Sequence, residues 1–280
     1  MKKSYKNISV IILGGDQRMR HLAQIFANKG FEVKDISEAE KMTDFNCDYL
    51  IFPLPLTQDG IHLNCQWDDK PRLVDIIKDI PCNTKVLAGC VSERVEDILQ
   101  QQGIGWNDYY ERESLLKQNA YLTAEATLQL VMQNLKHKIK NTKVLVIGSG
   151  RCGVSTAKLF KKMGAKVTLT SRKFKDKIKT LLMGVKAEKT AKLNQIVCEY
   201  QVIINTVPHP VLTENVLKNI PDNAFVVELA SSAAGVDLKA AEKLGKNLLY
   251  APSLPGRYLP FSAAEAISDT IIKIIREDFM

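Results

Sequence analysis

The chain has 280 residues, enough for one large or two medium-sized domains, and its composition of 45% hydrophobic, 25% charged and 7% aromatic residues is that of an ordinary globular protein. No apolar run approaches the roughly 18 residues of a membrane span, and the apolar stretch at residues 8–13 ends in Gly-Gly-Asp, which favours a strand over a signal-peptide core. We therefore expect a cytoplasmic protein without a membrane segment.

The positive charge is concentrated in one stretch. Residues 172–192 contain eight Lys and Arg against Asp176 and Glu188, which is most of the net charge of +8. Nucleic-acid binding is one interpretation, but Phe174 is the only aromatic residue there, and base stacking uses several. A solvated helix face beside a phosphate site explains the pattern more simply, so no nucleic-acid partner is expected.

The six cysteines form neither C-x-x-C pairs nor the Cys/His spacing of a zinc site, so no metal is expected. In a reducing cytoplasm they are predicted to be small buried hydrophobes. Cys152 begins a predicted helix, and a helix dipole can stabilise a thiolate there. The alternative is a small side chain tolerated where phosphates approach.

Strands and helices alternate in the first third of the chain, which implies βαβ units and a mostly parallel sheet. Hydrophobic periodicity predicts strands at residues 8–13, 31–33, 49–52 and 85–88, and helices at residues 19–28 and 93–102. A helical tract follows at residues 113–138, where Lys136, His137 and Lys138 suit the negative end of a helix dipole. We interpret this tract as a connector between two domains.

A second series of elements begins at residue 143. It comprises predicted strands at residues 144–147, 166–170, 202–205, 224–229 and 247–250, with helices at 154–163 and 237–244. A Pro-rich turn at residues 252–260 precedes an amphipathic helix at 262–276, which is expected to pack back on the first domain. The expected fold is α/β, with two Rossmann-like doubly wound parallel-sheet domains joined by a long connector helix. The expected divisions are a substrate domain at 1–118, the connector at 119–140, a nucleotide-binding domain at 141–261 and the C-terminal helix at 262–280.

Residues 148–153 read Gly-Ser-Gly-Arg-Cys-Gly between a predicted strand and a predicted helix, the context in which a G-x-G-x-x-G pattern indicates a dinucleotide site. Gly148 permits the tight turn, Gly150 lets the backbone approach a pyrophosphate, and Gly153 lets helix and strand pack closely. The pyrophosphate would lie against the amides at the positive end of the helix. The predicted cofactor contacts of this turn are Gly148, Ser149, Gly150, Arg151, Cys152 and Gly153.

The end of the next strand distinguishes NADP from NAD. NAD sites usually place Asp or Glu there for the ribose 2′-hydroxyl. This chain has Thr170, Ser171, Arg172 and Lys173, with no carboxylate before Asp176. Two hydroxyls, a guanidinium and an ammonium suit a 2′-phosphate, so NADP is the expected cofactor.

Two later strand ends extend the predicted crevice, because ligands of such sheets bind at the carboxyl ends of the strands. The candidate contacts there are Thr206, Val207, Pro208, Ala230 and Ser231. His209 is either an acid or base at neutral pH or an exposed loop residue between two prolines.

Taken in order, these motifs resemble the family of dipicolinate synthase A subunits, which belong to a bacterial sporulation enzyme, over nearly the whole chain. The more specific matches are Gly14-Gly15-Asp16-Gln17-Arg18, Thr123-Ala124-Glu125 and Leu254-Pro255-Gly256. The more general ones are Pro53-Leu54-Pro55, the glycine turn, Asn205-Thr206-Val207-Pro208 and Glu228-Leu229-Ala230-Ser231.

The resemblance implies a chain that works with a flavoprotein-like B subunit to oxidise a dihydrodipicolinate-type intermediate to pyridine-2,6-dicarboxylate, with NADP as hydride acceptor. Self-association into a homo-oligomer stays open. The chain departs from the family at residues 232–235, which replace a Pro-Gly-Gly-like turn, and at residues 259–262, which replace an expected Ala-Pro-Lys-Thr. Arg257 is the candidate to replace the missing lysine.

A ring with two carboxylates needs at least two anion pockets. Arg18 is the first candidate, with exposed amides of Gly14 and Gly15 beside it and Asp16 orienting its guanidinium. The alternative is that Asp16 caps a helix and Arg18 is a surface residue. The other predicted substrate contacts are Pro55, Thr57, Thr123, Pro255, Gly256 and Arg257.

Glu125 in the connector is either a base that removes a ring proton or a residue that holds the hinge. Three functions stay open on these residues. The first is the A subunit of the family above. The second is an NADP-dependent dehydrogenase of shikimate or 2-hydroxyacid type, although neither its Lys-Asp pair nor its Arg-Glu-His set is clearly placed. The third is a non-catalytic NADP-binding partner subunit.

Overall fold

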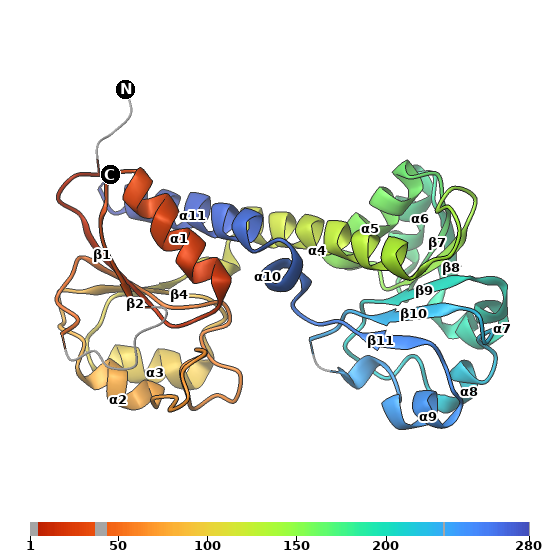
Figure 1. The fold of residues 1–280 in the computed structure, drawn as a ribbon, viewed down its shortest axis with the longest axis horizontal. Coiled ribbons are helices and arrows are strands. Elements are labelled where there is room, and N and C mark those ends of the chain that lie inside the picture. The colour runs from red at the N-terminus through yellow and green to blue at the C-terminus, as the bar shows by residue number, and fades with distance from the viewer. Residues whose placement is uncertain (1–4, 37–43, 232, 280) are drawn as a thin grey trace. The chain divides into compact units, whose positions relative to one another are not determined.

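The computed structural model describes residues 5–36, 44–231 and 233–279. The chain divides into two compact units, one made of Met1–Gln118 with Leu259–Met280 and the other of Asn119–Tyr258 (Figure 1). Each unit has a parallel sheet with helices on both faces, which confirms the predicted fold class of two doubly wound α/β domains. Among the described residues, no helix is long and apolar enough to cross a membrane.

The sheet of the first unit has five parallel strands in the order β2-β1-β3-β4-β5. The strands are β1 Ser9–Leu13, β2 Glu32–Ile36, β3 Tyr49–Ile51, β4 Lys85–Ala88 and β5 Trp106–Asp108. The helices of this unit are α1 Gln17–Asn28, α2 Leu73–Lys78, α3 Glu93–Gln101 and α11 Pro260–Glu277. Alternate residues of a strand face opposite sides of the sheet, and β1 follows this rule. Val10 and Ile12 join the core cluster that contains residues of α1 and α11, and Ile11 and Leu13 join the cluster of α2 and α3.

Helix α11 completes the core of the first unit although it lies at the opposite end of the sequence. Pro260 occupies the first turn, where its missing N–H costs no helical hydrogen bond. The helix lies along α1, and it contributes Ile267, Ile271 and Ile275 to the same core as Phe26 of α1. The segment before it differs from the prediction, because part of the expected Pro-rich turn forms the short helix α10 Leu254–Tyr258.

Helix α4 Glu113–Asn134 contains the boundary between the two units. It is shorter than the predicted tract, which extended to residue 138. Ile139 is buried and Thr142 Oγ1 donates a hydrogen bond of 2.9 Å to Lys138 O, so the segment after α4 is held as a turn. The basic residues expected at the helix end therefore follow the helix.

The sheet of the second unit has six parallel strands in the order β11-β10-β9-β6-β7-β8. The strands are β6 Lys143–Ile147, β7 Lys166–Ser171, β8 Lys186–Lys189, β9 Val202–Asn205, β10 Phe225–Glu228 and β11 Leu248–Tyr250. The helices are α5 Arg151–Lys162, α6 Phe174–Leu182, α7 Leu193–Ile196, α8 Glu214–Leu217 and α9 Leu238–Lys243. Leu145, Ile203 and Val226 of the strands pack with residues of α7, α8 and α9 on one face, and α5 and α6 contact β6, β7 and β8.

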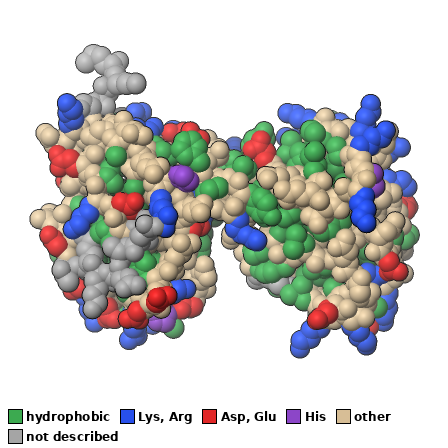
Figure 2. Space-filling model, viewed as in Figure 1, with side chains coloured by type: hydrophobic (Ala, Val, Ile, Leu, Met, Phe, Trp, Pro, Cys, Tyr) green, Lys and Arg blue, Asp and Glu red, His purple; other side chains and the backbone are tan. Residues whose placement is uncertain are grey.

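The basic stretch at residues 172–192 is only in part the expected helix face. Its first half forms α6, and Figure 2 shows Lys and Arg side chains gathered over the part of the second unit that holds this helix. Its second half forms β8, an edge strand that begins and ends with lysine. The sequence did not predict this strand, because three of its four residues are charged and it lacks the alternation of apolar and polar residues that indicates a strand.

Candidate functional site

The glycine turn joins β6 to α5 at the point where the strand order of the second unit reverses, since β6 lies between β9 and β7. Ligands of doubly wound sheets bind at such a switch point, outside the carboxyl ends of the strands. Gly150 is the N-cap residue of α5, and the first hydrogen bond into the helix runs from Val154 N to Gly150 O. The first amides of a helix have no acceptor within the helix, so the positive end of α5 suits an anion.

Each glycine of the turn has a different steric reason to be glycine. Gly148 has a φ of 104°, and a Cβ there would lie 2.7 Å from Thr206 Oγ1. A Cβ on Gly153 would lie 1.9 Å from Gly148 O, which the backbone cannot accommodate. A Cβ on Gly150 would meet nothing within 4 Å. Gly148 and Gly153 are therefore required by packing inside the protein, whereas Gly150 faces open space where a pyrophosphate can approach.

The residues after β7 provide cationic groups at the surface. Arg172 and Lys173 are exposed, and neither a carboxylate nor a bulky group precedes them at the strand end. Thr170 is completely buried and Thr190 Oγ1 donates to its hydroxyl at 3.4 Å, so the expected contribution of this hydroxyl at the surface is wrong. Ser171 is also buried, and its Oγ donates to Lys173 O at 3.3 Å. Arg172 and Lys173 are therefore the groups at the end of β7 that can contact a ligand.

Asp176 is a site residue that the motif did not assign. It lies in the first turn of α6, and its carboxylate accepts a hydrogen bond of 3.0 Å from Ser149 Oγ in the glycine turn. The contact ties the start of α6 to the phosphate-facing turn. The one signal along the chain is an acidic residue in the first turn of a helix, which is a common position with no ligand at all.

The ends of β9 and β10 are tied together by a buried carboxylate. Glu228 is fully buried, and its Oε2 accepts a hydrogen bond of 2.6 Å from Asn205 Nδ2 while its Oε1 accepts one of 2.8 Å from Ala230 N. Burial raises the pKa of Glu228 above its ordinary value, and the two hydrogen bonds lower it in part. A Cβ on Gly235 would lie 2.2 Å from Asn205 Nδ2, so the segment after β10 packs closely over this pair.

Asn205 in turn fixes the loop that follows β9. Its Oδ1 accepts from Val207 N and its Nδ2 donates to Val207 O, both at 3.1 Å. Thr206 Oγ1 donates to Ile147 O at 2.8 Å, and Thr206 and Val207 together border Gly148. The structure thus brings the predicted contacts of this loop against the glycine turn.

The remaining predicted contacts of this edge lie further out. Pro208, His209 and Ser231 are exposed, and the carbonyl of Ser231 accepts a hydrogen bond of 2.7 Å from Tyr250 OH. Ala230 is buried and acts through its amide on Glu228. Residue 232, in the turn that departs from the family, lies outside the described residues.

Cys152 and Thr123 connect α5 to α4. The side chain of Thr123 is hydrogen-bonded to Cys152, and its Oγ1 also donates to Asn119 O at 2.7 Å. Burial raises the pKa of the Cys152 thiol, although the bond to Thr123 and the charge of Arg151 lower it in part. The raised pKa favours a small, partly buried thiol at Cys152 over the alternative of a thiolate stabilised at the helix end.

Glu125, the candidate base, lies on α4 within the second unit. It borders a shallow hollow of about 450 Å³, together with Leu128, Met132 and Leu159, and it is hydrogen-bonded to Tyr121. Arg257 lies in α10 and is exposed, with its guanidinium 6.0 Å from the ring of Tyr258. Pro255 is buried in the same short helix, and Gly256 is half-buried. Among the residues that the structure describes, no hydrogen bond joins Glu125, Pro255, Gly256 or Arg257 to the glycine turn.

The turn after β1 holds the predicted substrate residues of the first unit. Arg18 donates to both carboxylate oxygens of Asp16 and, through Nη2, to Leu54 O at 2.6 Å. Burial alone would lower the pKa of Arg18, but its hydrogen bonds to Asp16 raise it above the ordinary value. Asp16 also caps α1 by accepting from Arg18 N. The alternative is thus correct in that Asp16 caps α1, but it is wrong in placing Arg18 at the surface, because Arg18 is buried.

Arg18 lies at the switch point of the first unit. The strand order reverses between β1 and β3, and the bond from Arg18 to Leu54 O joins the start of α1, which follows β1, to the loop that follows β3. The expectation of exposed amides beside it is wrong, because Gly15 N donates to Asn64 O at 2.8 Å and Gly14 N donates to Ile36 O at 3.4 Å. Among the described residues, Arg18 Nη1 has no hydrogen-bond acceptor and stays available.

The loop after β3 is fixed by its own hydrogen bonds. Pro55 O accepts from Asn64 Nδ2 at 2.9 Å. Thr57 Oγ1 donates to Asp59 at 3.1 Å and accepts from Gly60 N at 2.9 Å. Hydrogen bonds from the backbone and ring of His62 hold the pKa of the exposed Asp59 well below its usual range. The loop presents a fixed backbone beside Arg18, and the hydroxyl of Thr57 supports the loop itself.

Comparison with known proteins agrees with this geometry. Residues 9–110 match the family model of the N-terminal domain of the dipicolinate synthase A subunit, and residues 108–244 match that of the NAD binding domain of D-isomer specific 2-hydroxyacid dehydrogenases. The dipicolinate synthase A subunit of Bacillus subtilis (strain 168) is 29% identical over 203 residues, which are 72% of this chain and 68% of that protein.

Solved structures extend the likeness over nearly the whole chain. The dipicolinate synthase A subunit from Bacillus halodurans has a TM-score of 0.83 at 26% identity, covering 96% of this chain and 98% of that one. D-lactate dehydrogenase from Salmonella has a TM-score of 0.68 at 12% identity, covering 95% and 96%, and shares the fold alone.

The site and the matches define a dehydrogenase-type oxidoreductase with a nicotinamide dinucleotide site in its second unit. The more specific resemblance, to the A subunit of dipicolinate synthase, is confirmed.

Proposed function

We propose that the chain is the A subunit of an NADP-dependent dipicolinate synthase, which oxidises a dihydrodipicolinate-type intermediate to pyridine-2,6-dicarboxylate during sporulation. The substrate gives up a hydride and a proton, and its ring becomes aromatic, which favours the oxidation. The observation that carries the proposal is the glycine turn at the switch point of the second unit, in a chain that resembles dipicolinate synthase A subunits over nearly its whole length.

The exposed cations after β7 support NADP over NAD. Arg172 and Lys173 stand where NAD sites usually carry an acidic residue, and a guanidinium forms paired hydrogen bonds with a phosphate. Asp176 is the nearest carboxylate along the chain, and it is already bonded to Ser149. When bound, NADP supplies the hydride acceptor, and the residues of this chain supply binding and position.

We assign one substrate carboxylate to Arg18. Its guanidinium is held rigidly by Asp16 and Leu54 O, which leaves Nη1 for a ligand at the switch point of the first unit. A fixed guanidinium loses little conformational entropy on binding a carboxylate, so this arrangement suits recognition of one end of the substrate. The fixed loop at Pro55 and Thr57 borders this carboxylate position. Arg257 stays a predicted anion contact of the second unit.

Glu125 is the candidate base that removes a ring proton, and Tyr121 interacts with its carboxylate. The family name also implies a partner, and we propose that a flavoprotein-like B subunit completes the enzyme in the cytoplasm. The match of residues 108–244 to 2-hydroxyacid dehydrogenases favours an autonomous dehydrogenase of that type as the second candidate. A non-catalytic NADP-binding protein is the third.

One experiment separates these functions. The purified chain, with and without the candidate B subunit, is mixed with freshly made product of dihydrodipicolinate synthase and NADP⁺, and the absorbance of NADPH and of dipicolinate is followed. Turnover that needs the B subunit supports the proposal in full, and turnover by the chain alone supports an autonomous dehydrogenase. Turnover of a 2-hydroxyacid or of shikimate, with none of the dihydrodipicolinate-type substrate, contradicts the proposal.

A further inference from the structure

A second group of cations lies at the opposite edge of the nucleotide-binding sheet. Three neighbouring strands begin with lysine, namely β6 with Lys143, β7 with Lys166 and β8 with Lys186. In the sheet register Lys143 lies opposite Lys166, and Lys186 lies opposite Thr168. Residues that pair in parallel strands, and every second residue of one strand, face the same side. All three lysines therefore stand on the same face of the sheet as Thr168.

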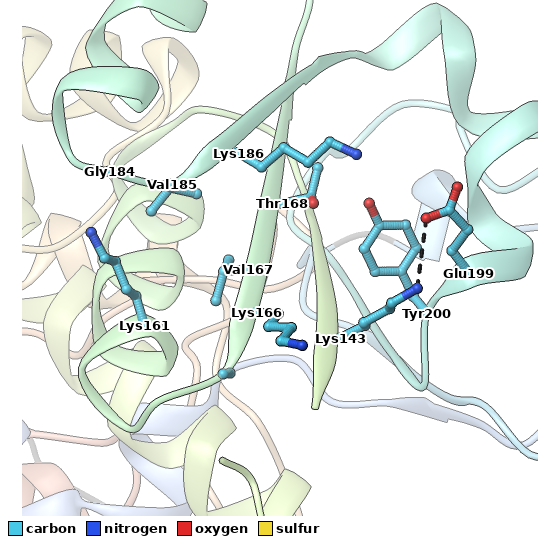
Figure 3. A pocket seen from close by; sticks show the side chains of 11 residues that line it. Lys143, Lys161, Lys166, Val167, Thr168, Gly184, Val185, Lys186, Glu199 and Tyr200 are labelled. Atoms are coloured by element: carbon cyan, nitrogen blue, oxygen red, sulfur yellow. Dashed lines mark ion pairs between the residues drawn. The ribbon is translucent and has the colours of Figure 1, made fainter. Parts of the chain in front are cut away.

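Two hydroxyl groups lie among these lysines. Tyr200, just before β9, is buried, and its hydroxyl points toward the same side of β7 as the side chain of Thr168 (Figure 3). Figure 3 shows the side chains of Lys186, Thr168, Tyr200 and Lys143 around one side of β7. They line a hollow of about 370 Å³, whose lining also contains Lys161. The hollow is large enough for a small metabolite.

The positive charge of this hollow is only partly neutralised. Glu199 is the one acidic residue of its lining, and its carboxylate lies 3.9 Å from Lys143 Nζ. Lys186 Nζ lies 3.8 Å from Glu188. Both N···O distances are longer than that of a charge-assisted hydrogen bond, and both lysine side chains are about half exposed. These ion pairs are therefore weak, and an anionic ligand can replace the carboxylates. Within the described part of the chain Lys166 has no ion pair.

The hollow is separate from the dinucleotide site. The lysines begin their strands, whereas the glycine turn follows the carboxyl end of β6. With five residues in β6, the two edges are about 15 Å apart along the strand. A nucleotide at the glycine turn leaves the amino edge accessible.

We propose that the hollow formed by Lys143, Lys166, Lys186, Thr168 and Tyr200 binds a small polyanion with two or more carboxylate or phosphate groups. Three ammonium groups on neighbouring strands suit separate anionic groups of one ligand, and a single negative charge would leave most of them unused. The tyrosine and threonine hydroxyls add neutral hydrogen-bonding groups between the cations. The inference does not depend on the substrate of the enzyme.

The test measures binding to the full chain saturated with NADP⁺, so that the glycine turn is occupied. Citrate and pyrophosphate are titrated at constant ionic strength by calorimetry, with acetate as the monoanion, and amide NMR shifts locate the bound ligand. Saturable binding of citrate or pyrophosphate, with shifts at residues 166–168, 184–186 and 199–200, is expected. The ligand that binds more tightly identifies whether the natural polyanion is a carboxylate or a phosphate.

The variants separate this site from the general charge of the protein. Lys166→Gln with Lys186→Gln should weaken binding about tenfold, because two exposed charge contacts together contribute on the order of 1.4 kcal/mol. The matched control, Lys158→Gln with Lys239→Gln, removes the same charge from exposed positions outside the lining and should leave binding unchanged. Equal loss in both variants, acetate binding as tightly as citrate, shifts elsewhere, or no saturable binding would overturn the proposal.

Discussion

Glu228 and Asn205 form a hydrogen bond of 2.6 Å between two fully buried side chains at the ends of adjacent strands. The pair does not border the glycine turn itself but contacts a residue that does. Asn205 holds both the amide and the carbonyl of Val207, and Val207 borders Gly148 of the glycine turn. A buried carboxylate is costly unless it is hydrogen-bonded, so this one has a structural task in keeping the loop after β9 against the turn.

Replacing Glu228 with Gln should lower the free energy of unfolding by about 1–3 kcal/mol. Both partners of the carboxylate, Asn205 Nδ2 and Ala230 N, are donors, and a glutamine amide presents an acceptor to only one of them. Urea unfolding measures the loss. Glu242→Gln, at an exposed position of α9, is the control that should change nothing.

The penalty of Glu228→Gln should also depend on pH. Burial raises the pKa of Glu228 in the folded chain, so the folded state keeps this proton at pH values where the unfolded state has lost it. The stability of the unsubstituted protein then falls as the pH rises above the ordinary glutamate value of about 4.3, and the variant lacks this slope. The difference between the two proteins should be larger near the ordinary pKa than at neutral pH; a difference that grows toward neutral pH would contradict the raised pKa.

Two glycines of the same turn should respond in opposite ways to alanine. Gly150→Ala should keep stability within about 0.5 kcal/mol, because its φ is −71° and a Cβ meets nothing within 4 Å. It should nevertheless weaken dinucleotide binding at least about tenfold by holding the pyrophosphate away. Gly153→Ala should cost about 3 kcal/mol or more in unfolding, since its Cβ would lie 1.9 Å from Gly148 O. Calorimetry and thermal unfolding of both variants test the pair, and equal loss of stability in both would be inconsistent with this account.

Arg172→Asp should reverse the preference between the two nicotinamide nucleotides. The variant removes a charge-assisted contact to the 2′-phosphate and adds a repulsive carboxylate, so NADP⁺ affinity should fall at least about tenfold while NAD⁺ affinity is kept or gained. Lys239→Asp, which makes the same change of charge at an exposed position of α9, should leave both affinities unaltered. Unchanged NADP⁺ affinity in Arg172→Asp would remove the argument for NADP.

Arg18→Lys separates recognition of a substrate from support of the fold. The lysine keeps the charge beside Asp16 but loses the fork that reaches Leu54 O and a ligand together. If Arg18 binds a substrate carboxylate, KM for the dicarboxylate should rise about tenfold, with NADP⁺ affinity unaffected. Asp16→Asn weakens the same ion pair from the other side and is the control for stability. A KM that rises equally in both variants would assign Arg18 a structural role alone.

Cys152 should react slowly with iodoacetamide near neutral pH. Its thiol pKa is raised by burial, so the reactive thiolate is scarce until the solution becomes alkaline. Peptide mapping by mass spectrometry follows each cysteine, and the exposed Cys198 provides the internal control that is alkylated first. Thr123→Val removes a hydrogen bond that lowers this pKa and should slow the reaction further. Rapid alkylation of Cys152 would restore the idea of an activated thiol.

The parts of the site that the sequence predicted are those with a local cause. The strand–glycine–helix order at residues 143–162 has both a hydrophobic period and a backbone requirement within one short segment, so β6, the turn and α5 lie where they were expected. The cationic pair Arg172 and Lys173 follows from its position after β7. Local patterns of this kind determine the fold class and the nucleotide site together.

The missed features depend on contacts between distant segments. Nothing near Ser149 indicates that Asp176, 27 residues later, bonds to it, and nothing near Gly15 shows that Asn64 takes its amide. The edge strand β8 has no apolar alternation, because only one residue of its four is buried. The end of α4 was placed too late because the basic residues beyond it suit a helix end equally well as a turn.

The return of α11 to the first unit has a consequence for synthesis on the ribosome. The second unit is one continuous segment, Asn119–Tyr258, so its own core is complete before α11 is translated. The core of the first unit is completed later, because Ile267, Ile271 and Ile275 follow the whole second unit along the chain. We therefore expect the second unit to complete its core first, against the usual N-terminal-first order, and a chain that stops before residue 260 would leave the face of the N-terminal sheet under α11 covered by α1 alone.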